Sequence, residues 1–153
     1  MAKRKRALTR RPSRMARELS ATRTCAPGVC DPRRTQGLRA PAPQGTHVLI
    51  DLEGPGVFLG AAVSKQGGAN NLTFVILDID GRNVTNLSFA AAGNLGLTQQ
   101  NPFGVVLVQS ALVKTFTMGF PTPLRFARSL RLSVKVNEPN VVQVLANVVH
   151  GGV

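Results

Sequence analysis

Apolar residues that alternate with polar ones mark one strand-like run after another in residues 46–153. In the clearest run, residues 130–136, every second residue is leucine or valine, and the residues between them are Arg131, Ser133 and Lys135. A period of two places the apolar set on one face of a β-strand and the polar set on the other. We therefore expect the leucines and valines to face a core and the three polar side chains to face solvent.

Eight such runs are predicted as strands: residues 46–52, 57–63, 72–79, 83–89, 105–110, 114–120, 130–136 and 141–149. Glycine, proline, asparagine and aspartate gather between the runs, as is typical of turns. The connection 90–101 is longer and has room for one short helical turn. Because no segment keeps a 3.6-residue period, the sequence predicts an all-β fold, a single antiparallel β-sandwich of about eight strands that is jelly-roll-like.

The last predicted strand differs from the others because it is apolar on both faces. Residues 141–149 carry valine, leucine or alanine at both odd and even positions and contain no charged residue. A strand of this kind is typical of the middle of a sheet, or of a surface that a neighbouring subunit covers. The sequence leaves these two alternatives open.

Charge divides the chain into two parts that are expected to meet different partners. Residues 1–39 hold twelve of the 19 Lys and Arg residues and only two acids, Glu18 and Asp31. We interpret residues 1–39 as a basic, extended anchoring arm, residues 40–45 as a Pro/Ala linker and residues 46–153 as the β-sandwich domain. Because the arm has little to bury and its charges repel one another, we expect it to be disordered in isolation.

The predicted partner-binding residues of the arm are its basic side chains, which are Lys3, Arg4, Lys5, Arg6, Arg10, Arg11, Arg14, Arg17, Arg23, Arg33, Arg34 and Arg39. They suit two kinds of acidic surface. Lys and Arg bind nucleic-acid phosphates in a salt-sensitive way, and Arg makes bidentate hydrogen bonds to protein carboxylates. Since the chain has no Trp or Tyr on which bases would stack, we favour a protein partner and keep nucleic-acid contact through the arm as the alternative.

The two cysteines of the sequence, Cys25 and Cys30, are a candidate disulfide. Pro27 and Gly28 lie between them and favour a tight reversal that would bring the thiols together. The alternative is a pair of reduced thiols in a turn, as in a protein made in a reducing cytosol. A zinc site needs about four ligands, so no metal is expected here.

Residues that could carry out catalysis are sparse, and we expect neither enzyme activity nor a cofactor. The two histidines, His47 and His150, lie near opposite ends of residues 46–153. We interpret them as exposed strand-end residues, although the first and last strands of a sandwich can be neighbours. No run of about 20 apolar residues is present, so no membrane span is expected.

Two acidic pairs, Asp51/Glu53 and Asp78/Asp80, are each spaced so that both carboxylates project from one face of a strand. We interpret them as residues of solvated faces and turns. Calcium binding through carboxylate oxygens is the main alternative, and glycoside hydrolysis by paired carboxylates is a more remote one.

Four segments carry a resemblance to a known class of protein: Ile79-Asp-Gly81-Arg82, Asn101-Pro-Phe-Gly104, Gly119-Phe-Pro-Thr-Pro-Leu-Arg-Phe126 and the valine-rich residues 141–149. Together with the basic arm and its hinge, residues 46–153 resemble small structural proteins of virus particles. In particular, they are similar to the minor capsid, decoration (cement) or collar proteins of tailed bacteriophages. The layout of an arm and a sandwich is also shared with icosahedral RNA-virus coat proteins.

The resemblance implies a non-enzymatic structural protein of the virion that is made in the host cytoplasm. It also implies a homo-oligomer, with a trimer favoured, that the arm anchors to a major capsid protein, to another virion protein or to the head–tail region. Two alternatives stay open. One is a virion-attached head that binds a host receptor or glycan through loops 66–71 and 90–101, and the other is a cellular or ribosome-associated nucleic-acid-binding protein.

Overall fold

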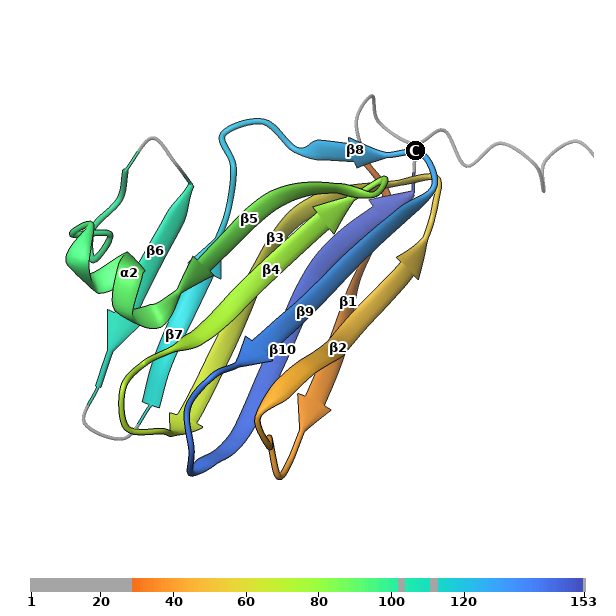
Figure 1. The fold of residues 1–153 in the computed structure, drawn as a ribbon. Helices are drawn as coiled ribbons and strands as arrows, with labels where there is room; N and C mark the ends of the chain where they lie inside the picture. Colours follow the sequence, from red (N-terminus) through yellow and green to blue (C-terminus); the bar gives the residue numbers. More distant parts are fainter. Residues whose placement is uncertain (1–28, 102–103, 111–112, 153) are drawn as a thin grey trace, which may run out of the picture.

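The computed structural model describes residues 29–101, 104–110 and 113–152, which form an all-β fold of two antiparallel sheets (Figure 1). Sheet A has the order β1 (Cys30–Arg39), β10 (Val141–Gly152), β3 (Gly56–Gly67), β7 (Val113–Met118) and β6 (Val105–Gln109), and β8 (Leu124–Phe126) also pairs with β3. Sheet B has the order β2 (Gly45–Glu53), β9 (Ser129–Val136), β4 (Thr73–Ile79) and β5 (Arg82–Ser88). The prediction of an all-β fold is therefore confirmed.

Each of the eight predicted strands is present, with bounds that differ by a few residues. The helical turn expected in the longer connection is α2 (Phe89–Asn94), which begins one residue earlier than the predicted segment. Ser88 caps it, because the Ser88 hydroxyl accepts a hydrogen bond of 3.0 Å from the Ala91 N–H. The sequence patterns gave no signal for β1 or β8.

The two sheets face each other (Figure 1), and side chains from both of them fill the core. The four predicted inward residues of β9 (Leu130, Leu132, Val134 and Val136) are fully buried, and they belong to one cluster with Val63 of β3 and Val144 of β10. Burying a leucine or valine side chain stabilises a fold by about 1.5–3 kcal/mol. The apolar side chains between the two sheets are therefore the main source of the stability of the fold.

One facing prediction for β9 is wrong. Arg131 and Lys135 are exposed as expected, whereas Ser133 is only 5% exposed. The reason is that β9 is an interior strand of sheet B, with β2 on one side and β4 on the other. The small Ser133 side chain lies between Val48 and Ile76 on the neighbouring strands, and these larger side chains cover it. The long side chains of Arg131 and Lys135 extend past their neighbours into solvent.

The doubly apolar last strand is an interior strand of sheet A, where β10 pairs with β1 on one side and β3 on the other. Val144, Ala146 and Val148 face the core and are fully buried. On the opposite face, Val142 and Val149 are 56% and 40% exposed. The interior position accounts for one apolar face, and the other remains open to solvent in this single chain.

The boundary of the folded unit is earlier than predicted, because Cys30–Arg39 forms β1 instead of the end of the arm. This segment lacks an alternating apolar pattern, yet it hydrogen-bonds along β10 with Arg34 opposite Val149 and Leu38 opposite Leu145. Backbone hydrogen bonds to β10 hold this segment as a strand even though its side chains do not alternate. The predicted linker is correspondingly the crossing from sheet A to sheet B, and its Ala42 is buried in the core.

Candidate functional site

The described part of the basic arm is β1, an edge strand of sheet A. Arg33, Arg34 and Arg39 are all exposed on it, and Arg33 forms an ion pair with Asp31, which is also exposed. The other nine predicted partner-binding residues, from Lys3 to Arg23, lie outside the described residues. The structure therefore places three arginines in fixed positions along an open sheet edge.

Cys30 is the first residue of β1 and is disulfide-bonded. Its predicted partner, Cys25, lies outside the described residues. Cys30 is also opposite Gly152 near the end of β10. Cys30 thus lies at the boundary between the basic arm and the first strand of the fold.

The two histidines are not brought together. His47 in β2 lies with its Nε2 atom 2.7 Å from the Pro43 carbonyl oxygen, whereas His150 in β10 lies with its Nε2 atom 2.9 Å from the Thr35 hydroxyl. Burial, followed by the positive charge of Arg33, holds the pKa of His150 below its ordinary value of 6.5. A hollow of about 250 Å³ opens beside His150.

Three of the four paired acids, Asp51, Asp78 and Asp80, make structural contacts, and Glu53 is exposed at the end of β2. Asp51 accepts two hydrogen bonds from Arg131, at 3.0 and 2.7 Å, and Asp78 lies opposite the same arginine on the next strand. The hydrogen bond to Asp51, followed by its charge, raises the pKa of Arg131. Asp78 also accepts a bond of 2.9 Å from the Asn83 amide.

Asp80 binds a loop that leads into β9. Its carboxylate accepts hydrogen bonds from the N–H groups of Ala127, Arg128 and Ser129 at 2.9, 2.7 and 3.0 Å. These backbone bonds lower the pKa of Asp80 below its ordinary value. Among the described residues, no three His, Cys, Asp or Glu side chains are grouped so as to hold a metal ion.

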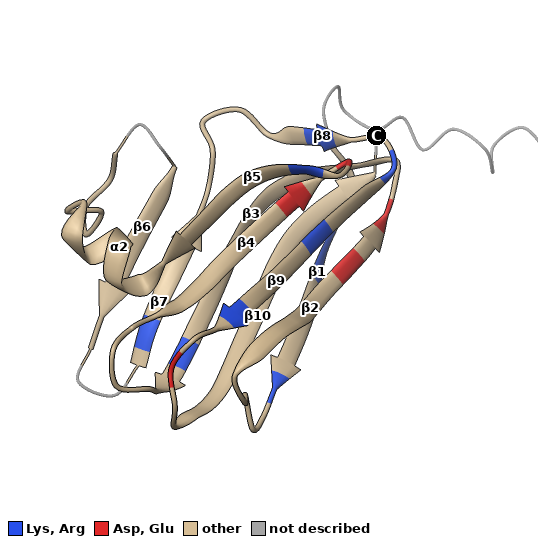
Figure 2. Ribbon diagram, viewed as in Figure 1, with Lys and Arg blue, Asp and Glu red and all other residues tan. Residues whose placement is uncertain are grey.

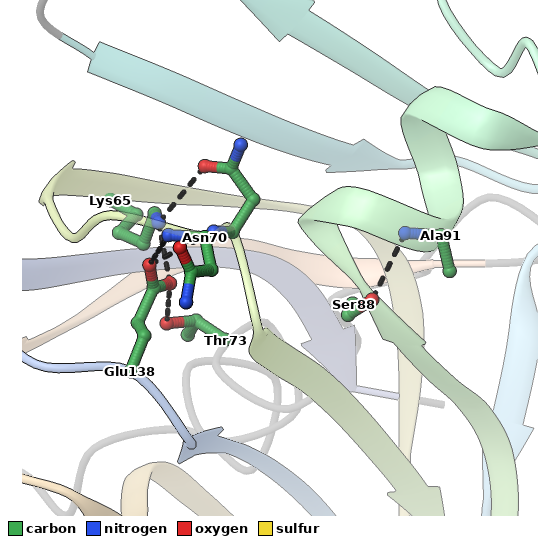
Figure 3. A network of polar contacts seen from close by, with 7 residues as sticks. Lys65, Asn70, Thr73, Ser88, Ala91 and Glu138 are labelled. Carbon is green, nitrogen blue, oxygen red and sulfur yellow. Dashed lines mark hydrogen bonds and ion pairs between the residues drawn. The ribbon is translucent and has the colours of Figure 1, made fainter.

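Among the residues that the structure describes, the polar site with the most hydrogen bonds is a cluster that the sequence did not reveal (Figure 3). We call it the buried cluster after its buried members, which are Lys65 near the end of β3, Thr73 at the start of β4 and Glu138 between β9 and β10. It also includes Asn70, which is exposed, and Asn71, which is half-buried, in the loop after β3. The side chains of Lys65 and Glu138 are 1% and 0% exposed, and their charged atoms are 2.6 Å apart. The Lys65 ammonium also lies 5.6 Å from the centre of the Phe89 ring.

Glu138 accepts hydrogen bonds on both of its carboxylate oxygens. Lys65 and the Thr73 hydroxyl donate to Oε1 at 2.6 and 2.7 Å. The N–H groups of Asn70 and Asn71 donate to Oε2 at 3.0 and 2.9 Å. Burial by itself raises the pKa of Glu138, but the bonds from Lys65, Thr73 and Asn70 outweigh it and hold the pKa below 4.5.

The opposite end of the molecule from β1 has almost no charge. Residues 83–113 contain no Lys, Arg, Asp or Glu, and α2 and β6 carry none of the coloured charges in Figure 2. Several apolar side chains are nevertheless exposed there, with Val84 at 40%, Leu95 at 66% and Val108 at 56%. Val84, Leu95 and Phe120 also line a hollow of about 390 Å³. We call this region the uncharged end.

Comparison with models of protein families and with curated proteins finds no match for this chain. In the part of the chain that the structure describes, no helix has the length and apolar character needed to cross a membrane.

Proposed function

We propose that this chain is a non-enzymatic structural protein of a virus particle, a jelly-roll sandwich that assembles with copies of itself and is anchored by its basic arm. The observation that carries the proposal is the order of the strands. Sheet A runs β1-β10-β3-β7 and sheet B runs β2-β9-β4-β5. The first four strands alternate between the sheets, and the late strands β9 and β10 each insert between early ones, an order that resembles a jelly roll.

Virus capsid domains are among the proteins that use this topology, together with lectins and cupins. The basic arm favours the first of these classes, since it supplies a means of anchoring that a soluble enzyme or lectin does not need. The receptor-binding alternative has less support, because the loop before β4 uses its Asn70 and Asn71 N–H groups to hold Glu138. Those groups are not available to an external ligand.

Self-assembly is supported by the contrast between the two ends of the sheets. Edge strands pair with other chains unless charged residues or bulges prevent it. The β1 edge carries Arg33, Arg34 and Arg39, whereas the β6 edge carries no charge and exposes Val108. We infer that the uncharged end contacts a second copy, since exposed apolar groups without nearby charge are typical of subunit interfaces.

The arm would then extend from the edge of sheet A toward an acidic partner. Because β1 is fixed to β10, the chain preceding Cys30 has a defined point of departure. A carboxylate-rich virion protein is the favoured partner, and packaged nucleic acid is the alternative.

The test compares the full chain with a variant that lacks residues 2–28 and so retains β1. We expect both proteins to form the same oligomer by light scattering and electron microscopy, since the arm is not needed for the sheets. Only the full chain should bind a polyanion, and that binding should weaken steeply with salt. Monomers at every accessible concentration would contradict the assembly proposal, and equal polyanion binding by both proteins would contradict the anchoring role.

A further inference from the structure

The buried cluster brings together an amine, a carboxamide and a carboxylate, the three groups needed to form an amide bond between side chains. The Lys65 Nζ atom lies 3.2 Å from the Asn71 Oδ1 atom, and 2.6 Å from the Glu138 Oε1 atom. The side chains of Lys65 and Glu138 have almost no contact with solvent. Figure 3 shows Lys65, Asn70 and Thr73 gathered around the Glu138 carboxylate.

We propose that Lys65 and Asn71 react to form an intramolecular isopeptide bond, with Glu138 as the acid–base group. This inference is independent of the proposed role in a virion. It requires no cofactor, oxidant or second protein, because nucleophile, electrophile and proton carrier all belong to the cluster.

The reaction begins with proton transfer from the Lys65 ammonium to Glu138 along their hydrogen bond, which leaves a neutral amine and a carboxylic acid. This neutral pair is the less populated state, because the other hydrogen bonds to Glu138 favour its charged form. The amine nitrogen then attacks the Asn71 Cγ atom. A new N–C bond forms as the carbonyl electron pair moves onto Oδ1. Glu138 gives its proton to the Asn71 Nδ2 atom and takes one from the attacking nitrogen. The bond from Cγ to Nδ2 breaks, ammonia leaves, and a secondary amide joins the two side chains.

The contacts of the cluster favour this reaction in two ways. The Thr73 hydroxyl and the N–H groups of Asn70 and Asn71 hold the Glu138 carboxylate in a fixed orientation against Lys65. A fixed arrangement of reacting groups replaces a bimolecular encounter and lowers the entropic part of the barrier. Burial excludes water, which would otherwise solvate the amine.

The loop over the cluster is shaped for close contact with it. Gly68 has a φ of 85°, and a Cβ atom added there would lie 2.4 Å from the Glu138 Oε2 atom and 2.9 Å from the Lys65 Nζ atom. Only glycine satisfies both the backbone conformation and the space. Asn71 itself has a φ of 58°, a conformation in which asparagine is more common than other residues with a side chain.

Intact mass spectrometry of the folded full chain tests the proposal directly. We expect a mass lower by one ammonia than the sequence with its disulfide, and a cross-linked peptide that joins Lys65 to Asn71. Trypsin should not cleave after Lys65, and an amine-acylating reagent applied after denaturation should leave Lys65 unmodified. A folded protein that retains its full mass after prolonged incubation would overturn the proposal.

Variants separate this reaction from succinimide formation at Asn71, which also releases ammonia. Lys65→Arg should abolish the mass loss, as should Asn71→Asp under neutral conditions, and Glu138→Gln should slow it at least tenfold. Lys114→Arg, at the position opposite Lys65 on β7, is the matched control and should react as the parent does. Mass loss that persists in Lys65→Arg would contradict the proposal. If the variants fail to fold, the mass and peptide map of the parent protein decide the question.

Discussion

Lys65 and Glu138 lie 73 positions apart in the chain and are nevertheless the most completely buried charges of the described residues. Removing one partner of a buried pair is strongly destabilising, by roughly 3–5 kcal/mol, because the other charge is left without compensation. Four hydrogen bonds to Glu138 therefore hold the loops between β3 and β4 and between β9 and β10 together. By contrast, Arg131 and Asp51, which the sequence placed on solvent-facing surfaces, form an exposed ion pair. Salt screens the attraction between these two charges, so the pair contributes little to stability.

His150 provides a prediction at the scale of one residue. Its pKa in the folded protein lies below 6.5, so the unfolded chain binds the proton more readily. The contribution of His150 to stability should be present above pH 6.5 and be lost as the pH falls through the folded pKa. Thermal unfolding between about pH 8 and about pH 5 should show this loss.

The matched variant is His150→Gln, which keeps a polar side chain near Thr35 and does not titrate. Its midpoint of unfolding should vary less with pH than that of the parent protein. His47→Gln is the control, since His47 lies in the other sheet. An unchanged pH profile in His150→Gln would show that other groups cause the acid sensitivity.

Among the elements, β1 differs most from the sequence prediction, because residues of the predicted arm form a strand of sheet A. It adds a sixth strand to sheet A and covers one side of β10. Gly37 on β1 is buried, and a Cβ atom at this position would lie 2.1 Å from the Leu49 carbonyl oxygen. The strand thus fits closely against β2 of the other sheet, and it belongs to the fold even though it carries charges of the arm.

Removing β1 should therefore destabilise the domain, whereas removing the preceding residues should not. A variant that lacks residues 2–39 is expected to unfold at a lower temperature and to aggregate, because it exposes the edge of β10. The variant that lacks residues 2–28 should keep the parent midpoint in circular dichroism. A point variant, Gly37→Val, should lose about 1–3 kcal/mol through overpacking.

Gln36→Val is the control for Gly37→Val, since Gln36 is the exposed neighbour on the same strand. It should change the free energy of unfolding little. Equal stability of the parent and the variant lacking residues 2–39 would mean that β1 is dispensable, and the predicted boundary at residue 46 would then be restored.

The whole molecule has two unlike ends. One is the β1 edge with its arginines, and the other is the uncharged end, which consists of β5 after Arg82 together with α2 and β6 (Figure 2). This polarity suits a subunit that contacts copies of itself with one end and anchors with the other. Apolar burial would drive the first contact and charge the second, so the two should respond oppositely to salt.

A charge placed at the uncharged end should prevent self-assembly. Val108→Lys, on the exposed edge strand β6, is expected to shift the protein to monomers in light scattering without lowering its thermal midpoint. Val48→Lys is the matched control, because Val48 is 54% exposed on β2, almost as much as Val108 at 56%. If Val48→Lys alone prevented assembly, the interface would lie at the other end of sheet B.

The sequence by itself determined the strands whose residues alternate, and hence the all-β class and the burial of the β9 leucines and valines. It also determined the split between a basic arm and a nearly neutral body, because charge is a property of composition. Only the tertiary structure decided that Cys30–Arg39 is a strand, since its partner β10 is more than a hundred residues away. The buried cluster depended on tertiary structure for the same reason: Glu138 has the sequence surroundings of a turn, and only the packing of two loops places it against Lys65.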